Sequence, residues 1–161
     1  EEKNVEEIKF ERAHAARNQL WEARHYVAYA YSNAYPGKDL MVTDVCVPFS
    51  ELANAVISAR KELEELGLDG GIVGHVGDGN YHVLLMIDLD DPEEINKAND
   101  FTERIVQYAL DRGGTCTGEH GVGVGKVKYQ RREHGKAYDM MRKIKNAIDP
   151  DNLFNPGKII D

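Results

Sequence analysis

The residues best suited to chemistry in this sequence are two histidines that flank one predicted turn. His75 and His82 lie on either side of Asp78-Gly79, a dipeptide that strongly favours a β-hairpin. If Asp78-Gly79 forms a two-residue type I′ turn, His75 faces His82 directly, with their Cβ atoms about 4.5–5.5 Å apart. Two imidazoles at that spacing can bind one ion at about 2.0–2.1 Å. A structural or surface pair of histidines is the alternative interpretation.

A glycine-rich segment over residues 114–125 offers further ligands. It contains Glu119 and His120, with Gly118 and Gly121 on either side. Adjacent residues of a regular strand point to opposite faces, but backbone supported by glycine allows both side chains to converge on one point. Two histidines and one glutamate are a ligand set for Zn, Mn or Fe(II) that leaves positions open for a substrate. A tight structural turn is the alternative.

The other reactive features are weaker candidates. The glycine-rich segment matches no phosphate-binding loop, because Lys126 stands where G-x-G-x-x-G requires its third glycine. Arg24 by itself is a surface residue of a predicted helix, but it is a candidate for binding a carboxylate if the substrate is an acid. Cys116 has no visible base partner and is interpreted as structural. Plain surface positions are expected for His14, His25 and His134.

Hydrophobic periodicity and turn residues predict the elements that position these candidates. The expected strands cover residues 8–12, residues 41–47 and the two arms of a hairpin within 71–88. The expected helices cover residues 13–32, the stretch from an N-cap at Ser50 to a C-cap at Gly67, residues 92–112 and residues 135–148. We therefore predict an α+β fold, in which an antiparallel sheet carries helices on one face and an irregular tail follows over residues 152–161.

Length and charge limit the classes of function. The 161 residues suffice for one domain with a hydrophobic core but leave no room for a separate dinucleotide-binding domain. With 28 acidic against 20 basic residues and a net charge of −8, the chain is not expected to bind nucleic acid. Its two cysteines give no disulfide framework, and no apolar run reaches the length of a membrane span.

Five motifs together carry a family resemblance. They are, in order, Leu20-Trp21-Glu22-Ala23-Arg24-His25, Thr43-Asp44-Val45-Cys46-Val47-Pro48, Gly74-His75-Val76-Gly77-Asp78-Gly79-Asn80-Tyr81-His82, Gly118-Glu119-His120-Gly121, and Asp149-Pro150 with Asn155-Pro156-Gly157-Lys158. The chain resembles the C-terminal part of the FAD-linked oxidases of the vanillyl-alcohol oxidase superfamily. Within that group it is most similar to the cytochrome-type D-lactate dehydrogenases; glycolate oxidase FAD subunits and D-2-hydroxyglutarate dehydrogenases are close relatives.

The resemblance implies an enzyme with two parts. An N-terminal domain binds FAD, and a C-terminal cap completes the active site over the flavin. Residues 1–161 correspond to the cap as a single domain, without the FAD-binding domain. The resemblance implies metal ligands at His75, His82 and Glu119, a catalytic base at His120, a substrate-binding arginine at Arg24, and a flavin-side position in the returning tail at Asn155.

The resemblance also implies a reaction, the oxidation of a 2-hydroxy acid. Arg24 and the divalent metal orient the substrate, His120 takes the hydroxyl proton, and a hydride passes from C2 to FAD. Relatives that act on dicarboxylates have polar or basic residues where this chain has Leu84, Met41 and Val42. We therefore expect a short monocarboxylate, D-lactate before glycolate, because a second carboxylate would be buried without partners. The isolated chain is expected to bind no FAD and to show no activity.

Two alternative functions stay open. One is a subunit of the glycolate oxidase type, and the other is a non-catalytic metal-binding module on the same fold. The expected partners are the substrate, the FAD-binding domain, and an electron acceptor such as cytochrome c or a quinone. The sequence leaves the oligomeric state and the compartment open: the resemblance implies a cytoplasmic or membrane-peripheral protein in a bacterium and a mitochondrial one in a eukaryote.

Overall fold

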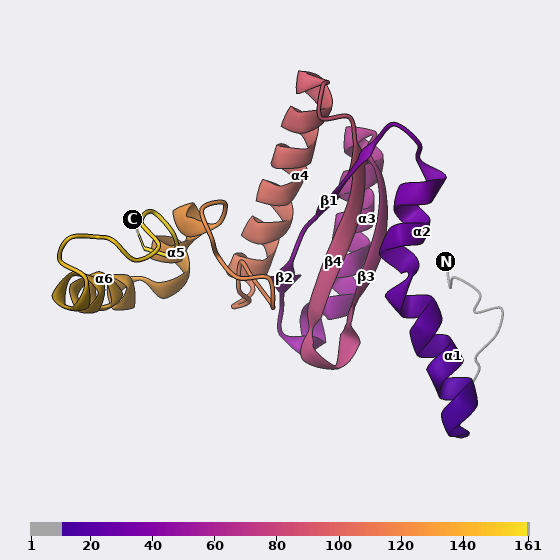
Figure 1. Cartoon of the computed structure of the whole chain (residues 1–161), viewed down its shortest axis with the longest axis horizontal. Helices are drawn as coiled ribbons and strands as arrows, with labels where there is room; N and C mark the ends of the chain where they lie inside the picture. Colours follow the sequence, from indigo (N-terminus) through magenta and orange to yellow (C-terminus); the bar gives the residue numbers. More distant parts are fainter. Residues whose placement is uncertain (1–10, 161) are drawn as a thin grey trace.

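The computed structural model describes residues 11–160 and has one small antiparallel sheet with helices, the predicted α+β class (Figure 1). The helices are α1 (His14–His25), α2 (Val27–Ala34), α3 (Leu52–Leu66), α4 (Pro92–Asp111), α5 (Val127–His134) and α6 (Lys136–Ile148). The strands are β1 (Asp39–Val42), β2 (Val45–Cys46), β3 (Asp69–His75) and β4 (Asn80–Ile87). Of the strand predicted over residues 8–12, residues 8–10 lie outside the described part, and residues 11 and 12 form no strand. Within residues 11–160, no helix has both the length and the apolar character needed to cross a membrane.

Strand β4 is the centre of the sheet and pairs with all three other strands. β3 lies along one side of β4, and β1 followed by β2 lies along the other. The β-prone run predicted over residues 41–47 is thus two short strands that break at Thr43 and Asp44. At the break, the Val83 N–H donates to the Thr43 hydroxyl at 2.9 Å. Every residue of β4 is buried, so both faces of this strand are covered.

Helices lie on both faces of the sheet. Adjacent residues of a strand face opposite sides, and Gly70 and Gly71 of β3 show what covers each side. A Cβ on Gly70 would lie 3.2 Å from Leu63 of α3, whereas a Cβ on Gly71 would lie 2.6 Å from Tyr31 of α2. Helices α3 and α4 form the main hydrophobic core, as predicted for one face. Helix α2 covers part of the other face, on which β4 carries Leu84 and Met86 next to the polar Asn80 and His82.

The hairpin does not have the predicted register. Its turn is a 3-10 turn over Val76–Asp78 that ends at Gly79, and His75 pairs with Asn80 instead of His82. A type I′ turn needs positive φ at both Asp78 and Gly79, and of the two only Gly79 has it. The turn is also hydrogen-bonded to the residue that follows β2, because the Val47 N–H donates to the Gly79 carbonyl at 3.0 Å. Because side chains alternate with a period of two, this change keeps both histidines on the same face of the sheet.

Two predicted helix boundaries are also wrong, and a third is confirmed. The helix predicted over residues 13–32 breaks at Tyr26, next to His25, whose imidazole Nδ1 lies 2.7 Å from the Trp21 carbonyl oxygen. Ser50 is not an N-cap, because a 3-10 turn over Phe49–Glu51 leads into α3. The C-cap at Gly67 is confirmed, with a left-handed φ of 64°.

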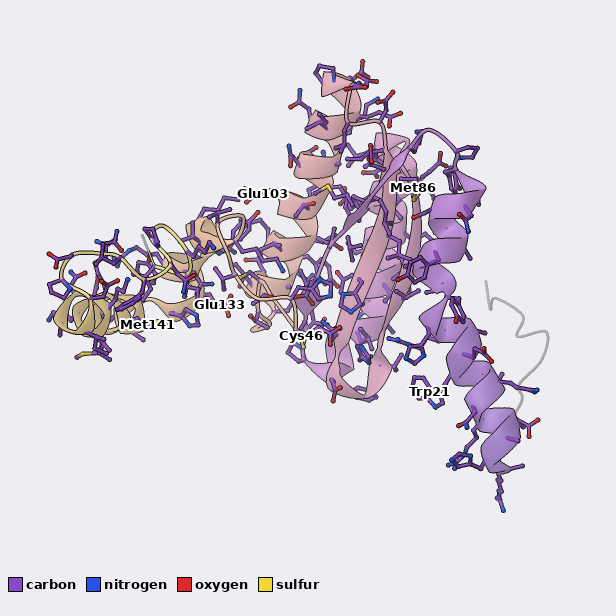
Figure 2. All side chains as sticks on the ribbon, in the orientation of Figure 1. Trp21, Cys46, Met86, Glu103, Glu133 and Met141 are labelled. Carbon is purple, nitrogen blue, oxygen red and sulfur yellow. The ribbon has the colours of Figure 1, made fainter. Side chains whose placement is uncertain are left out.

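Helix α5, which the sequence pattern does not predict, is joined to α4 through Glu103. This side chain projects from α4 toward α5 and accepts hydrogen bonds from Tyr129 Oη at 2.6 Å and from Lys128 Nζ at 2.7 Å (Figure 2). Burial alone would raise the pKa of Glu103, but hydrogen bonds from Lys128 and Tyr129 outweigh burial and hold the pKa at about 2. The α4–α5 contact therefore depends on an ionised carboxylate.

Gly74 tests how closely β3 and β4 approach each other. A Cβ at this position would lie 2.4 Å from the backbone oxygen of Asn80, which cannot move away without breaking the hairpin. We expect Gly74→Ala to lower the free energy of unfolding by about 1–3 kcal/mol, measured by urea denaturation. The matched control is Gly77→Ala, since a Cβ on Gly77 meets nothing within 4 Å. Equal stabilities of the two variants would contradict the described packing.

Glu103 gives a pH dependence to the α4–α5 contact. Its folded-state pKa of about 2 is below the ordinary value of about 4.3, so its stabilising effect is full above about pH 5 and is lost as the pH falls toward 2. At pH 7 we expect the free energy of unfolding to be larger for wild type than for Glu103→Gln. This difference should be smaller at pH 3, as measured by urea denaturation at each pH. A difference that does not change between pH 7 and pH 3 would contradict the assignment.

Candidate active site

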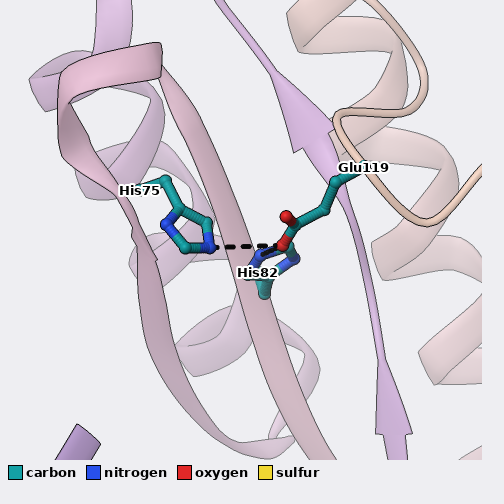
Figure 3. A group of neighbouring side chains, drawn as sticks. All are labelled: His75, His82 and Glu119. Atoms are coloured by element: carbon teal, nitrogen blue, oxygen red, sulfur yellow. Dashed lines mark ion pairs between the residues drawn. The ribbon is translucent and has the colours of Figure 1, made fainter. Parts of the chain in front are cut away.

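Three side chains from β3, β4 and the glycine-rich loop converge on one point (Figure 3). His75 Nε2 lies 3.3 Å from Glu119 Oε1, and His82 Nε2 lies 2.9 Å from the same oxygen. The candidate ligand atoms of all three side chains lie within 4.8 Å of one another. The structure therefore brings together the three residues predicted as a metal site, although through a diagonal pair of histidines.

The orientation of His82 is fixed by its other ring nitrogen. Nδ1 lies 3.2 Å from the carbonyl oxygen of Thr43, and the ring is buried. Because a carbonyl oxygen only accepts, Nδ1 carries the hydrogen, and in the neutral ring Nε2 presents a lone pair. That lone pair faces a carboxylate oxygen of Glu119 at 2.9 Å. Two acceptors at this distance repel each other unless a proton or a metal cation lies between them.

The donor set fits a small divalent cation. A tetrahedral ion with bonds of about 2.0–2.1 Å holds its ligand atoms about 3.3 Å apart, and the two imidazoles lie 2.9 and 3.3 Å from Glu119 Oε1. Two imidazole nitrogens and one carboxylate oxygen suit Zn, Mn and Fe(II) alike. His82, Glu119 and His75 would hold such an ion, with the Thr43 carbonyl keeping the His82 ring in place.

Glu119 and His120 both face His82, although they are adjacent in the chain. The His120 ring stacks on the His82 ring with centroids 4.7 Å apart and an angle of 8° between the planes. His120 Nε2 lies 3.9 Å from Glu119 Oε1. The convergence predicted for glycine-supported backbone is therefore present, and it puts a half-exposed imidazole directly beside the candidate metal ligands.

Sequence analysis assigns no role to Asp44, although this residue lies directly behind the candidate ligands. Its side chain is only 2% exposed, and its carboxylate accepts hydrogen bonds from the backbone N–H groups of Gly118, Glu119 and His120 at 2.9–3.3 Å. Burial alone would raise the pKa of Asp44, but hydrogen bonds from His120 and other donors outweigh burial and hold the pKa well below its ordinary value. The one sequence signal for it is an aspartate that interrupts a β-prone run.

Arg24 lies on the other side of the histidine pair. Its Nη2 atom is 3.2 Å from His75 Nε2, and its guanidinium lies over Trp21, 5.9 Å from the ring centroid. Within residues 11–160, no carboxylate forms an ion pair with Arg24. A recess of about 240 Å³ opens here, lined by Arg24, His25, Val27, Ala28, Val42, Val73, His75, His82, Leu84, Glu119 and His120. Arg24, the ligand triad and His120 thus face one space, whose remaining wall includes the apolar side chains of Val42, Val73 and Leu84.

Comparison with known proteins assigns this chain to a family. A family model described as "FAD linked oxidases, C-terminal domain" matches residues 1–159. The chain belongs to this family of FAD-linked oxidases. The assignment confirms the resemblance carried by the five sequence motifs.

Two of the proteins similar to this chain are named as D-lactate dehydrogenases. The probable mitochondrial D-lactate dehydrogenase of Danio rerio is 44% identical over 146 residues, which is 90% of this chain and 29% of the relative. The mitochondrial D-lactate dehydrogenase [cytochrome] of Arabidopsis thaliana is 40% identical over 158 residues, which is 98% of this chain and 28% of the relative. The chain thus spans less than a third of the length of either relative.

A solved structure supports the fold of this FAD-linked oxidase domain. The 4-ethylphenol oxidase from Gulosibacter chungangensis, in its isoeugenol complex, superposes with a TM-score of 0.63. The match covers 92% of this chain and 31% of that chain, at 19% sequence identity. At this identity the likeness shows a shared fold.

Three other sequence candidates lie in different surroundings. Asn155 lines a separate recess with Lys145 and Phe154 in the tail, and it is not among the residues that line the candidate site. His25, predicted as a plain surface residue, is exposed but also lines the candidate site. Cys116 is buried, and burial raises the pKa of its thiol to about 12, which fits its structural interpretation.

The triad predicts metal binding by this chain. We expect one Zn²⁺ ion to bind per chain in isothermal titration calorimetry. His82→Ala or Glu119→Gln should weaken Zn²⁺ binding by more than roughly 10–100-fold, which is the loss typical when a residue that only supports a metal ligand is replaced. His134→Ala is the matched control, because His134 lies on α5 and is not among the residues that line the recess. Unchanged affinity in His82→Ala would contradict the site.

Proposed function

We propose that this chain is the cap domain of a FAD-dependent dehydrogenase that oxidises a short D-2-hydroxy acid to the 2-oxo acid. The observation that carries the proposal is that Arg24, the ligand triad and His120 all line one recess. Their groups match the three parts of such a substrate: a carboxylate, a hydroxyl oxygen and a hydroxyl proton. Similarity to proteins named D-lactate dehydrogenases supports the same reaction class.

Each residue has a separate task in this proposal. The Arg24 guanidinium holds the substrate carboxylate through two parallel hydrogen bonds. His120 takes the hydroxyl proton at Nε2, which lies 3.9 Å from Glu119 Oε1 and so beside any group held at the triad. When bound, the divalent cation at His75, His82 and Glu119 supplies a Lewis acid, and FAD supplies the hydride acceptor.

The walls of the recess favour a small monocarboxylate. Val42, Val73 and Leu84 line it, and Arg24 is the one lysine or arginine among the described residues that do so. A second carboxylate buried against these side chains would have no cationic or hydrogen-bonding partner, which is costly. D-lactate, whose methyl group suits an apolar wall, is therefore the first choice of substrate and glycolate the second.

The remaining partners of the proposed enzyme follow from its family. FAD would be bound mainly by a domain outside this chain, and Asn155 in the tail is the residue of this chain proposed to contribute on the flavin side. An electron acceptor such as cytochrome c or a quinone would be the further partner, and the mitochondrial relatives favour a mitochondrial compartment if the source is eukaryotic. The competing function is a non-catalytic metal-binding module. Such a module would bind the metal ion, but the protein would show no dehydrogenase activity for Arg24 to affect.

Arg24 tests the proposed function in the full protein that carries this chain and FAD. We expect D-lactate to be oxidised with a higher kcat/KM than D-2-hydroxyglutarate. We also expect Arg24→Met to lower kcat/KM for D-lactate by about 100-fold, because a bidentate hydrogen bond to a charged group contributes roughly 3 kcal/mol. Arg17→Met, on the same helix, is the matched control. A preference for D-2-hydroxyglutarate would contradict the substrate, and an unaffected Arg24→Met variant would contradict the role of Arg24.

A further inference from the structure

The carboxylate of Asp44 lies behind the candidate site, on the side away from the recess. Asp44 is at the break between β1 and β2, and it is buried under the loop that carries Glu119 and His120. Its Oδ1 atom also lies 3.6 Å from His82 Nδ1. One buried group therefore touches the loop that holds the carboxylate ligand and the strand that holds the buried histidine.

Three consecutive backbone N–H groups point at this carboxylate. The N–H groups of Gly118, Glu119 and His120 lie 2.9, 3.1 and 3.0 Å from Asp44 Oδ2. Successive N–H groups that converge in this way form an anion-binding concavity. Here the anion is a side chain of the protein itself. With their backbone atoms turned inward to Asp44, Glu119 and His120 present their side chains to the recess.

The remaining lone pairs of Asp44 are also occupied. Thr117 Oγ1 donates to Oδ2 at 2.8 Å, and Asn80 Nδ2 donates to Oδ1 at 2.8 Å. Lys126 Nζ lies 3.3 Å from Oδ2 and balances the buried charge. Gly118 is required for this close packing, since a Cβ there would lie 1.9 Å from the Asn80 side-chain nitrogen.

We propose that Asp44 is the positioning residue of this site: its buried carboxylate fixes the loop over residues 117–120, and through that loop it sets the direction of Glu119 and His120. Asp44 itself lines no part of the recess and binds neither substrate nor metal. An asparagine of the same shape cannot replace it, because one carboxylate oxygen becomes an NH₂ donor that faces other donors. The metal-binding part of this inference rests on the proposed function, whereas the loop-ordering part does not.

Two measurements on Asp44→Asn separate these parts. The first is amide hydrogen exchange, in which the N–H groups of residues 118–120 should exchange about 10–100-fold faster than in wild type, the expected result of losing bonds to a charged acceptor. The second is Co²⁺ titration with the visible spectrum recorded, in which the Kd should rise about 10–100-fold and the ligand-field bands should shift. Glu94→Gln is the matched control: Glu94 accepts hydrogen bonds from Lys38 and from the Asp88 N–H at the other end of the sheet, outside the site, and this variant should leave both readouts as in wild type.

The outcomes are distinguishable from failure of the proposed function. If wild type binds no Co²⁺, the metal site is wrong, and amide exchange still decides the role of Asp44. The positioning role is overturned if the amides of residues 118–120 exchange as slowly in Asp44→Asn as in wild type. It is also overturned if wild type binds Co²⁺ and Asp44→Asn binds it with the same Kd and the same spectrum. If Asp44→Asn does not fold, Thr117→Val removes a single bond to the carboxylate and should give a smaller change in the same direction. No change in that variant would equally overturn the proposal.

Discussion

The arrangement of this domain depends on one buried negative charge. Moving a carboxylate out of water is costly unless hydrogen bonds and a counter-charge replace its hydration. Asp44 receives both: three backbone N–H groups, two side-chain donors and the Lys126 ammonium surround it. The glycine-rich loop adopts the conformation that satisfies this charge, and the same conformation aims two adjacent side chains at the histidines.

The sheet provides the other half of the site. β4 is buried on both faces, so His82 has a fixed place within the domain, and β3 carries His75 one diagonal step away on the same face. The interruption between β1 and β2 has two consequences at once. It frees the Thr43 carbonyl to orient the His82 ring, and it turns Asp44 under the loop. The recess lies where α2, the sheet and the loop meet.

Much of this arrangement could be predicted from the sequence. Asp78-Gly79 placed two histidines on neighbouring strands, and period-two alternation kept them on one face even though the turn type and the register were wrong. Glycine on both sides of Glu119-His120 correctly indicated that the pair could converge. Long-range polar contacts left no comparable pattern. Nothing near Asp44 indicates that its backbone N–H partners lie more than 70 residues away along the chain. Most side chains of α5 are polar, and Glu103 joins this helix to α4 through long-range hydrogen bonds.

We expect two imidazoles and one carboxylate of this chain to share one divalent cation. Extended X-ray absorption fine structure of the Zn²⁺-loaded chain measures that coordination shell directly. We predict nitrogen and oxygen neighbours of Zn²⁺ at about 2.0–2.1 Å, together with the outer-shell scattering of two imidazole rings. In His82→Ala the scattering of one ring should be lost. A shell of oxygen atoms without imidazole scattering, or a sulfur neighbour at about 2.3 Å from Cys46, would contradict it.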